Sequence, residues 1–256
     1  MLNRSLKAIN KRLEYSLDRV SYQKHKKQAH DNFTELKSQV TDRDKCLIIA
    51  NGPSLKDTDL GTYNDFKIIT MNRAYVMWEE LLGSVPFAHV CINSLVLEQF
   101  KNDLLNLKCP TFYNYAAVKN DLPNAPGNLT PILMGYFIGD RLVSEATHPF
   151  SSSGTVSFVC MNLAIMMGFR HISIVGLDHS FHNKGAVNQT TIMRDEDKNH
   201  FFTGYFPKGT RWELPDLERS EKGYRLVNEY CSKKGIKIIN ESAYSACDVF
   251  PRLTQK

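Results

Sequence analysis

A run of four apolar residues that ends directly in a tight turn constrains the fold of this chain more than any other feature. Residues 47–50 lead into Asn51-Gly52-Pro53-Ser54, the pattern of a buried parallel strand followed by a turn and a helix. Gly52 can take a positive φ and lets a ligand approach the backbone, and Pro53 fixes φ. Ser54 can cap the next helix, and we expect its hydroxyl and the nearby amides to face outward. Backbone N–H groups at such a helix start form a phosphate site. A plain strand-turn-helix connection is the alternative.

Other apolar segments repeat this pattern along the chain. Predicted strands at 66–71 and 88–92 end in Asn72-Arg73 and Asn93, and further strands are expected at 110–115, 171–176 and 236–240. Predicted helices at 96–107, 156–167 and 216–234 alternate with them. This order predicts an α/β fold, Rossmann-like and doubly wound, with a mainly parallel sheet. Polar residues at the carboxyl ends of such strands are where this class of fold binds ligands.

A second turn rich in hydroxyls and glycine precedes the helix predicted at 156–167. It contains Ser152, Ser153, Gly154 and Thr155, and it suits an anion or a ribose at a helix N-terminus. Asp178, at the end of the strand 171–176, could bind a ribose hydroxyl, as acidic residues do in other nucleotide-binding folds.

The positive charge of the chain is confined to its N-terminal part. Residues 1–45 hold 11 Lys and Arg against 6 Asp and Glu, so the whole net charge of +5 lies there. We divide the chain into a basic leader, 1–44, and a Rossmann-like domain, 45–256, with an insertion or lid at about 119–150. An amphipathic helix is predicted over 1–38. Docking on its own domain, on a partner helix or second copy, and on an anionic membrane all stay open.

Composition excludes several other classes of protein. No apolar run is long enough to span a membrane, and the N-terminus lacks the apolar core of a secretory signal, so a cytoplasmic protein is expected. The six cysteines show no CxxC spacing, so neither a zinc site nor a disulfide framework is predicted. Charge balance beyond residue 45 argues against a nucleic-acid-binding core.

The order and spacing of these motifs resemble a known family. Ile-Ile-Ala-Asn-Gly-Pro-Ser-Leu, Asn72-Arg73, Ser-Ser-Gly-Thr, and Gly-Phe-Arg-His-Ile-Ser-Ile-Val-Gly-Leu-Asp, followed by His-Phe, are similar to bacterial lipooligosaccharide sialyltransferases. The chain also resembles the broader group of 6-hydroxymethylpterin pyrophosphokinase-like (MptE-like) proteins, which its ending Ile-Ile-Asn-Glu-Ser-Ala…Val-Phe-Pro-Arg fits better. The resemblance covers about residues 45–253.

This resemblance implies a transferase that uses a CMP-activated acidic sugar as donor substrate, without a metal or other cofactor. Asn51, Gly52, Pro53 and Ser54, with Asn72 and Asn93, would then hold the phosphate. Ser152, Ser153, Gly154 and Thr155 would line the sugar or ribose pocket, and Asp178 the cytidine side.

The sequence departs from the sialyltransferases at two positions that matter for catalysis. Ser180 replaces an expected tyrosine, and Gly204 stands where a catalytic histidine is expected. An acceptor hydroxyl still needs a base, for which His200 is the first candidate and His179 the second.

Other residues could supply the remaining contacts to the donor. Tyr205 could replace the missing tyrosine at the phosphate. Arg73, Arg211 or Arg252 could hold a sugar carboxylate.

We therefore expect a glycosyltransferase that moves sialic acid, another nonulosonic acid or Kdo onto a cell-surface glycan precursor, as in lipopolysaccharide or capsule biosynthesis. Its acceptor would be a glycan or lipid-linked glycan at the inner face of the cytoplasmic membrane. One alternative is a Mg-ATP-dependent pterin pyrophosphokinase, favoured by the group name and by Asp57 and Asp59. Another is a non-catalytic module of polysaccharide assembly, favoured by Gly204.

Overall fold

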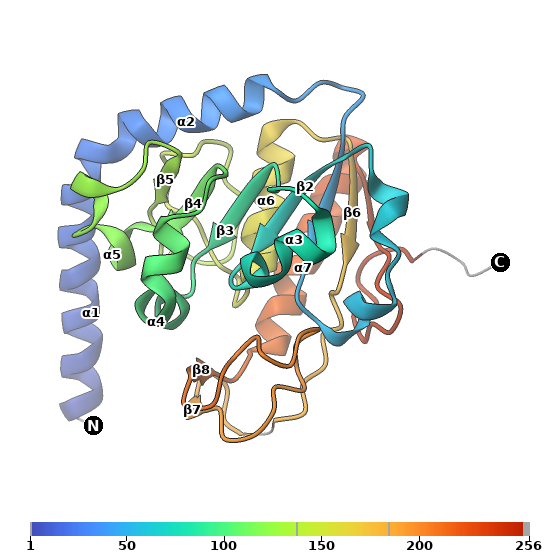
Figure 1. Cartoon of the computed structure of the whole chain (residues 1–256). Coiled ribbons are helices and arrows are strands. Elements are labelled where there is room, and N and C mark those ends of the chain that lie inside the picture. Colours follow the sequence, from blue (N-terminus) through green and yellow to red (C-terminus); the bar gives the residue numbers. More distant parts are fainter. Residues whose placement is uncertain (1, 137, 184, 253–256) are drawn as a thin grey trace.

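A seven-stranded sheet forms the centre of the computed structural model, which describes residues 2–136, 138–183 and 185–252 (Figure 1). The strand order is β5-β4-β3-β2-β1-β6-β9, and each of the six pairings is parallel. The strands are β1 (Lys45–Ile49), β2 (Phe66–Met71), β3 (Ala88–Cys91), β4 (Thr111–Asn114), β5 (Leu129–Ile132), β6 (His171–Val175) and β9 (Lys237–Asn240). The predicted Rossmann-like, doubly wound fold is confirmed.

Helices cover both faces of the sheet (Figure 1). On one face lie α6 (Val156–Met167) and α7 (Leu217–Lys234), and on the other α3 (Trp78–Leu82), α4 (Ser94–Leu105) and α5 (Tyr115–Val118). Along β1, Cys46 and Ile48 belong to the buried apolar cluster that contains α6, whereas Leu47 and Ile49 belong to the cluster on the other face, which contains α4. A strand buried on both faces needs apolar residues at every position, which explains the unbroken apolar run at 47–50.

The chain reverses its direction across the sheet between β1 and β6. It runs outward from β1 to β5 and then returns to β6 on the other side of β1. In an open α/β sheet, this reversal leaves a crevice at the carboxyl ends of the two central strands. The loops that follow β1 and β6 therefore border the expected ligand site.

Two segments outside the predicted strands contain strands. The insertion at 119–150 supplies β5, an edge strand in which Pro131 is tolerated because an edge position can lack a ladder donor. The polar stretch 182–199 contributes β7 (Thr190–Ile192), which pairs antiparallel with β8 (Arg211–Glu213).

The leader is helical, as expected, and it contacts the sheet domain. It consists of α1 (Leu2–Ser21), a 3₁₀ turn (Tyr22–His25) and α2 (Lys26–Ser38), which packs on β5 and α6. Of the helices in the described ranges, none combines the length and the apolar character needed to cross a membrane.

Candidate functional site

A cavity of about 150 Å³ lies at the carboxyl ends of β1, β2 and β6, where the chain reverses its direction. Its other walls are the N-terminal turns of α6 and α7 and the segment that precedes β8. Of the residues predicted to form the site, it is lined by Asn51, Gly52, Asn72, Gly154, Thr155, Asp178, His179 and His200. Residues from distant parts of the sequence thus meet at one end of the sheet.

The loop after β1 packs tightly against the loop after β6, and Gly52 makes this packing possible. Its N–H donates to the Gly176 carbonyl at 2.8 Å. A Cβ at Gly52 would lie 2.6 Å from that same oxygen and 2.6 Å from Cγ of Asp178. Gly52 does not adopt the positive φ that a glycine can take, because φ is −69° there. Glycine is needed at this position for close approach, not for a left-handed backbone.

The turn that was expected to hold a phosphate instead holds a carboxylate of the chain. Ser54 lies in a five-residue 3₁₀ helix that begins at Pro53, and its N–H donates to Oδ2 of Asp178 at 2.8 Å. Its hydroxyl donates to Oδ1 of Asp178, so the prediction of an outward-facing hydroxyl is wrong. Both oxygens of Asp178 already accept from Ser54. Burial raises the pKa of Asp178, against the opposing effect of these hydrogen bonds.

Two asparagines at neighbouring strand ends present unpaired side-chain oxygens. Asn51 is 8% exposed, and its Nδ2 donates to the Met71 carbonyl at 3.2 Å and to the Tyr205 hydroxyl at 2.8 Å. Asn72 has φ of 51°. Oδ1 of each is buried without a hydrogen-bond partner. Since buried polar atoms are nearly always satisfied in proteins, these two oxygens indicate places where a ligand donates.

Arg73 and Asn93, in contrast, do not line the cavity. Arg73 is 7% exposed, its guanidinium lies 3.7 Å from the ring centre of Phe100, and Nη1 donates to the Tyr205 carbonyl. Asn93 caps α4, because its Oδ1 accepts from the N–H groups of residues 95 and 96. Both predicted ligand contacts are therefore replaced by structural ones.

Tyr205 supports the site from beneath, so its predicted contact with a phosphate is wrong. It is fully buried, and its hydroxyl accepts from Asn51 and, at 3.0 Å, from the N–H of Arg73. Burial raises the pKa of this phenol, which keeps it protonated. Its ring stacks on His200 at a centroid distance of 4.0 Å.

The turn before α6 contributes only its second half to the cavity. Gly154 and Thr155 line it, whereas Ser152 and Ser153 do not. Ser153 is fully buried, and its hydroxyl donates to the Arg219 carbonyl in α7 at 3.3 Å. Thr155 caps α6 by accepting from the N–H of Ser157 at 3.3 Å.

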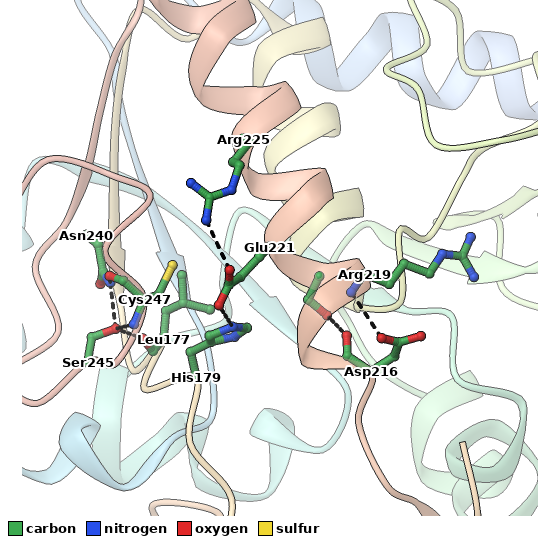
Figure 2. A network of polar contacts seen from close by, with 10 residues as sticks. Leu177, His179, Asp216, Arg219, Glu221, Arg225, Asn240, Ser245 and Cys247 are labelled. Carbon is green, nitrogen blue, oxygen red and sulfur yellow. Dashed lines mark hydrogen bonds and ion pairs between the residues drawn. The ribbon is translucent and has the colours of Figure 1, made fainter. Parts of the chain in front are cut away.

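Three helical N-termini border the cavity, and they differ in the charge of their caps. The carboxylate of Asp178 occupies the one at Ser54, and the carboxylate of Asp216 caps α7 by accepting from the N–H of Arg219 at 3.0 Å (Figure 2). Only a neutral hydroxyl, that of Thr155, caps α6. Since a helix N-terminus carries partial positive charge, the α6 terminus is the one whose charge is not already compensated.

His200 lines the cavity and is held by a buried carboxylate. Its Nδ1 lies 2.7 Å from Oδ2 of Asp197, whose side chain has no exposed surface. The other oxygen of Asp197 accepts from the N–H of Asn199 at 3.0 Å. A proton on Nδ1 shared with this carboxylate leaves Nε2 to accept one from a ligand. This arrangement suits a general base.

His179, which also lines the cavity, forms a second histidine–carboxylate pair. Its Nε2 lies 3.2 Å from Oε1 of Glu221 in α7, and Arg225 donates to the other oxygen of that carboxylate at 3.1 Å (Figure 2). His179 has a left-handed backbone, with φ of 54°. The side chain of this histidine is only 5% exposed.

Sequence reasoning missed Asp197, Glu221 and Ser157. Asp197 stands three residues before His200, a spacing that could have been noticed. Glu221 lies 42 positions from His179, and nothing local relates them. Ser157 and Met71 both line the cavity. The hydroxyl of Ser157 donates to Sδ of Met71 at 3.6 Å, and a thioether sulfur is a weak acceptor.

Three other charged residues that the sequence analysis named, Asp59, Arg211 and Arg252, do not line the cavity. Asp59 caps a short 3₁₀ helix through the N–H of Gly61 at 3.0 Å. Arg211 pairs with Glu98 at 2.7 Å, and Arg252 donates to backbone carbonyls near the C-terminus. Within the described ranges, no three His, Cys, Asp or Glu side chains come together as metal ligands.

A protein-family model matches the sequence over more than half of its 256 residues. The model described as 6-hydroxymethylpterin diphosphokinase MptE-like matches residues 20–184. The chain belongs to this family. The predicted resemblance to MptE-like proteins is thereby confirmed, and the match includes the end of α1 and all of α2. No curated protein sequence matches this MptE-like chain.

Solved structures similar to this MptE-like protein include sialyltransferases. The structure of CstII from Campylobacter jejuni with CMP-3FNeuAc has 18% identity and a TM-score of 0.49, covering 82% of this chain and 86% of that one. The structure of CST-II with a trisaccharide acceptor and CMP has 17% identity and a TM-score of 0.46, with the same coverage. At these values the likeness carries no argument about activity.

Proposed function

We propose that this MptE-like protein is a transferase that moves a sugar from a CMP-activated donor to an acceptor hydroxyl. The observation that carries the proposal is the His200–Asp197 pair at a cavity bordered by the uncompensated N-terminus of α6. A base and an anion site are the two groups that such a transfer requires.

The residues would divide the reaction as follows. Nε2 of His200 takes the proton of the acceptor hydroxyl while the oxygen of that hydroxyl attacks the anomeric carbon of the donor sugar. The bond between that carbon and the phosphate oxygen breaks, and its electrons leave with CMP. The N-terminus of α6 and the hydroxyl of Ser157 stabilise the departing phosphate, and His179 beside Glu221 can supply it with a proton. Asn51 and Asn72 accept hydrogen bonds from the donor.

The charge of the cavity supports a donor with a single phosphate. Its described lining residues include no Lys or Arg, and the carboxylate among them, Asp178, is held by Ser54. A triphosphate presents three linked phosphate groups, and this described lining offers no cationic side chain to contact them. The sequence resemblance to lipooligosaccharide sialyltransferases supports an acidic sugar and a glycan or lipid-linked glycan acceptor. Pyrophosphoryl transfer to a pterin is the second candidate, favoured by the description of the family.

A thermal-shift screen with CMP, CDP, UDP, GDP, ATP and a pterin, each with magnesium or with EDTA, tests the choice. A ligand at 100 times its Kd should stabilise the fold by about 2.7 kcal/mol. We expect CMP to do so in EDTA. Stabilisation by ATP only with magnesium would replace the proposal with the second candidate, and no response to any nucleotide would contradict both.

Hydrolysis of a CMP-sugar donor then tests the proposed base. His200→Ala should abolish turnover. His148→Ala is the matched control, because His148 also pairs with a carboxylate, Glu145 at 3.7 Å, but on the surface. Equal loss in both variants would contradict the assignment of His200.

A further inference from the structure

The helix α1 carries a stripe of exposed apolar side chains. Leu6, Ile9, Leu13, Leu17 and Val20 are 53–72% exposed. They are five of the eleven large hydrophobic side chains that are exposed in the described chain, and the other six are scattered over it. At about 100° per residue, the five lie within roughly 80° of the helix circumference. A continuous apolar patch of this kind marks an interaction surface.

The opposite face of α1 already contacts the domain, so the stripe points away from it. Asp18 accepts from Lys119 at 2.7 Å, and Ser21 accepts from the Tyr115 hydroxyl at 2.9 Å. Tyr22, directly after the helix, is fully buried. Figure 1 shows α1 along one side of the molecule, with its N-terminal end toward the same end as β7 and β8. Packing within the chain therefore fixes the stripe in an outward orientation.

Charge distinguishes the possible occupants of this surface. The helix α1, residues 2–21, contains five Lys and Arg but only two Asp and Glu, and one of these acids, Asp18, is paired with Lys119. Two copies of such a segment would repel each other. A regular heptad of stripe residues would also place Ser16 in the seam between two helices. An apolar stripe on a strongly basic helix instead matches a surface that offers both acyl chains and negative charge.

We propose that the apolar stripe of α1 binds the surface of an anionic lipid bilayer, with the helix lying in the plane of the interface. Lys11 and Arg19 of α1 contact lipid phosphates, and the five apolar side chains enter the acyl region. This inference does not depend on the proposed function, because it concerns a different face of the molecule.

Vesicle flotation with the full chain tests the inference. We expect binding to phosphatidylcholine vesicles with 30% phosphatidylglycerol and at least tenfold weaker binding to pure phosphatidylcholine. Leu13→Gln with Leu17→Gln should reduce binding to the anionic vesicles at least tenfold. The matched control is Val85→Gln with Ile192→Gln, which removes two apolar side chains of similar exposure, 56% and 54% against 60% and 61%. This control should bind like wild type.

Two results would overturn the inference. One is equal binding of the wild type and the Leu13/Leu17 variant to anionic vesicles, or no binding of either. The other comes from light scattering: a wild-type dimer that becomes a monomer in the same variant would assign the stripe to a second copy. Thermal melts of both double variants should match wild type, since all four side chains are exposed.

Discussion

Replacing the neutral cap of α6 by a carboxylate should remove anion binding while it leaves the fold intact. In Thr155→Asp, the new side chain can accept from the N–H of Ser157 as Thr155 does. Aspartate ranks at least as high as threonine at this position and interacts favourably with the helix dipole. Stability should therefore stay within about 0.5 kcal/mol of wild type.

The effect on a bound phosphate should be large. A carboxylate about 5 Å from a phosphate oxygen, at an effective dielectric constant of about 20, opposes binding by about 3 kcal/mol. This energy corresponds to roughly a hundredfold increase in Kd. In the Asp variant, a carboxylate would compensate the positive N-terminus of α6, as Asp178 and Asp216 already do at the two neighbouring helical N-termini.

Isothermal titration with CMP measures this effect, and Thr155→Asn is the matched control. Asparagine has nearly the shape of aspartate and also caps helices well, but it carries no charge. We expect the Asn variant to bind CMP within threefold of wild type and the Asp variant about a hundredfold more weakly. Equal Kd values for the Asp and Asn variants would refute the assignment of α6 as the anion site.

Three further predictions concern the site and the core beneath it. Gly52→Ala should lower the free energy of unfolding by about 3 to 5 kcal/mol in urea titrations, from overpacking and a disturbed Asp178 pair; Gly127→Ala, whose Cβ would meet nothing within 4 Å, should change it by less than about 1 kcal/mol. Asp197→Asn should reduce kcat by about 10²- to 10⁴-fold, because His200 loses the carboxylate that holds it; an unchanged kcat would count against that role. His89 is fully buried, and burial lowers its pKa to about 3. Below pH 6.5, His89 is therefore protonated in the unfolded chain, whereas it stays neutral in the folded chain. This site alone should lower the free energy of unfolding by about 2 kcal/mol between pH 7 and pH 5. Urea titrations of His89→Gln should lack that loss.

The central strands were predictable because each is a short apolar run with a polar end. The prediction for β2 was 66–71 and that for α6 was 156–167, and the structure has both bounds. The edge strand β5 was missed because it has only four residues, Leu-Thr-Pro-Ile, with a proline that argues against a strand. Its pairing with β4 and the packing of α2 against it override that local preference.

The gathering of strand-end residues was also predictable, but their partners were not. Asn51, Asn72 and His179 do line one cavity, as parallel strand ends in an open sheet require. Asn93 looked equivalent in the sequence, yet it lies on the outer side of β2 and caps α4. Whether a strand-end asparagine meets a ligand thus depends on its distance from the chain reversal between β1 and β6.

The turn at 51–54 shows why a phosphate-type motif in a sequence does not identify a phosphate site. Its local chemistry is as predicted: an N–H and a hydroxyl at Ser54 bind an oxyanion. That oxyanion belongs to Asp178, which lies 124 positions away and was itself expected to bind the ligand. Each of the two predictions was chemically sound, but the residues satisfy each other. The positive end of a helix can attract a substrate only if the fold brings no carboxylate of its own to it, and at this cavity the N-terminus of α6 meets that condition.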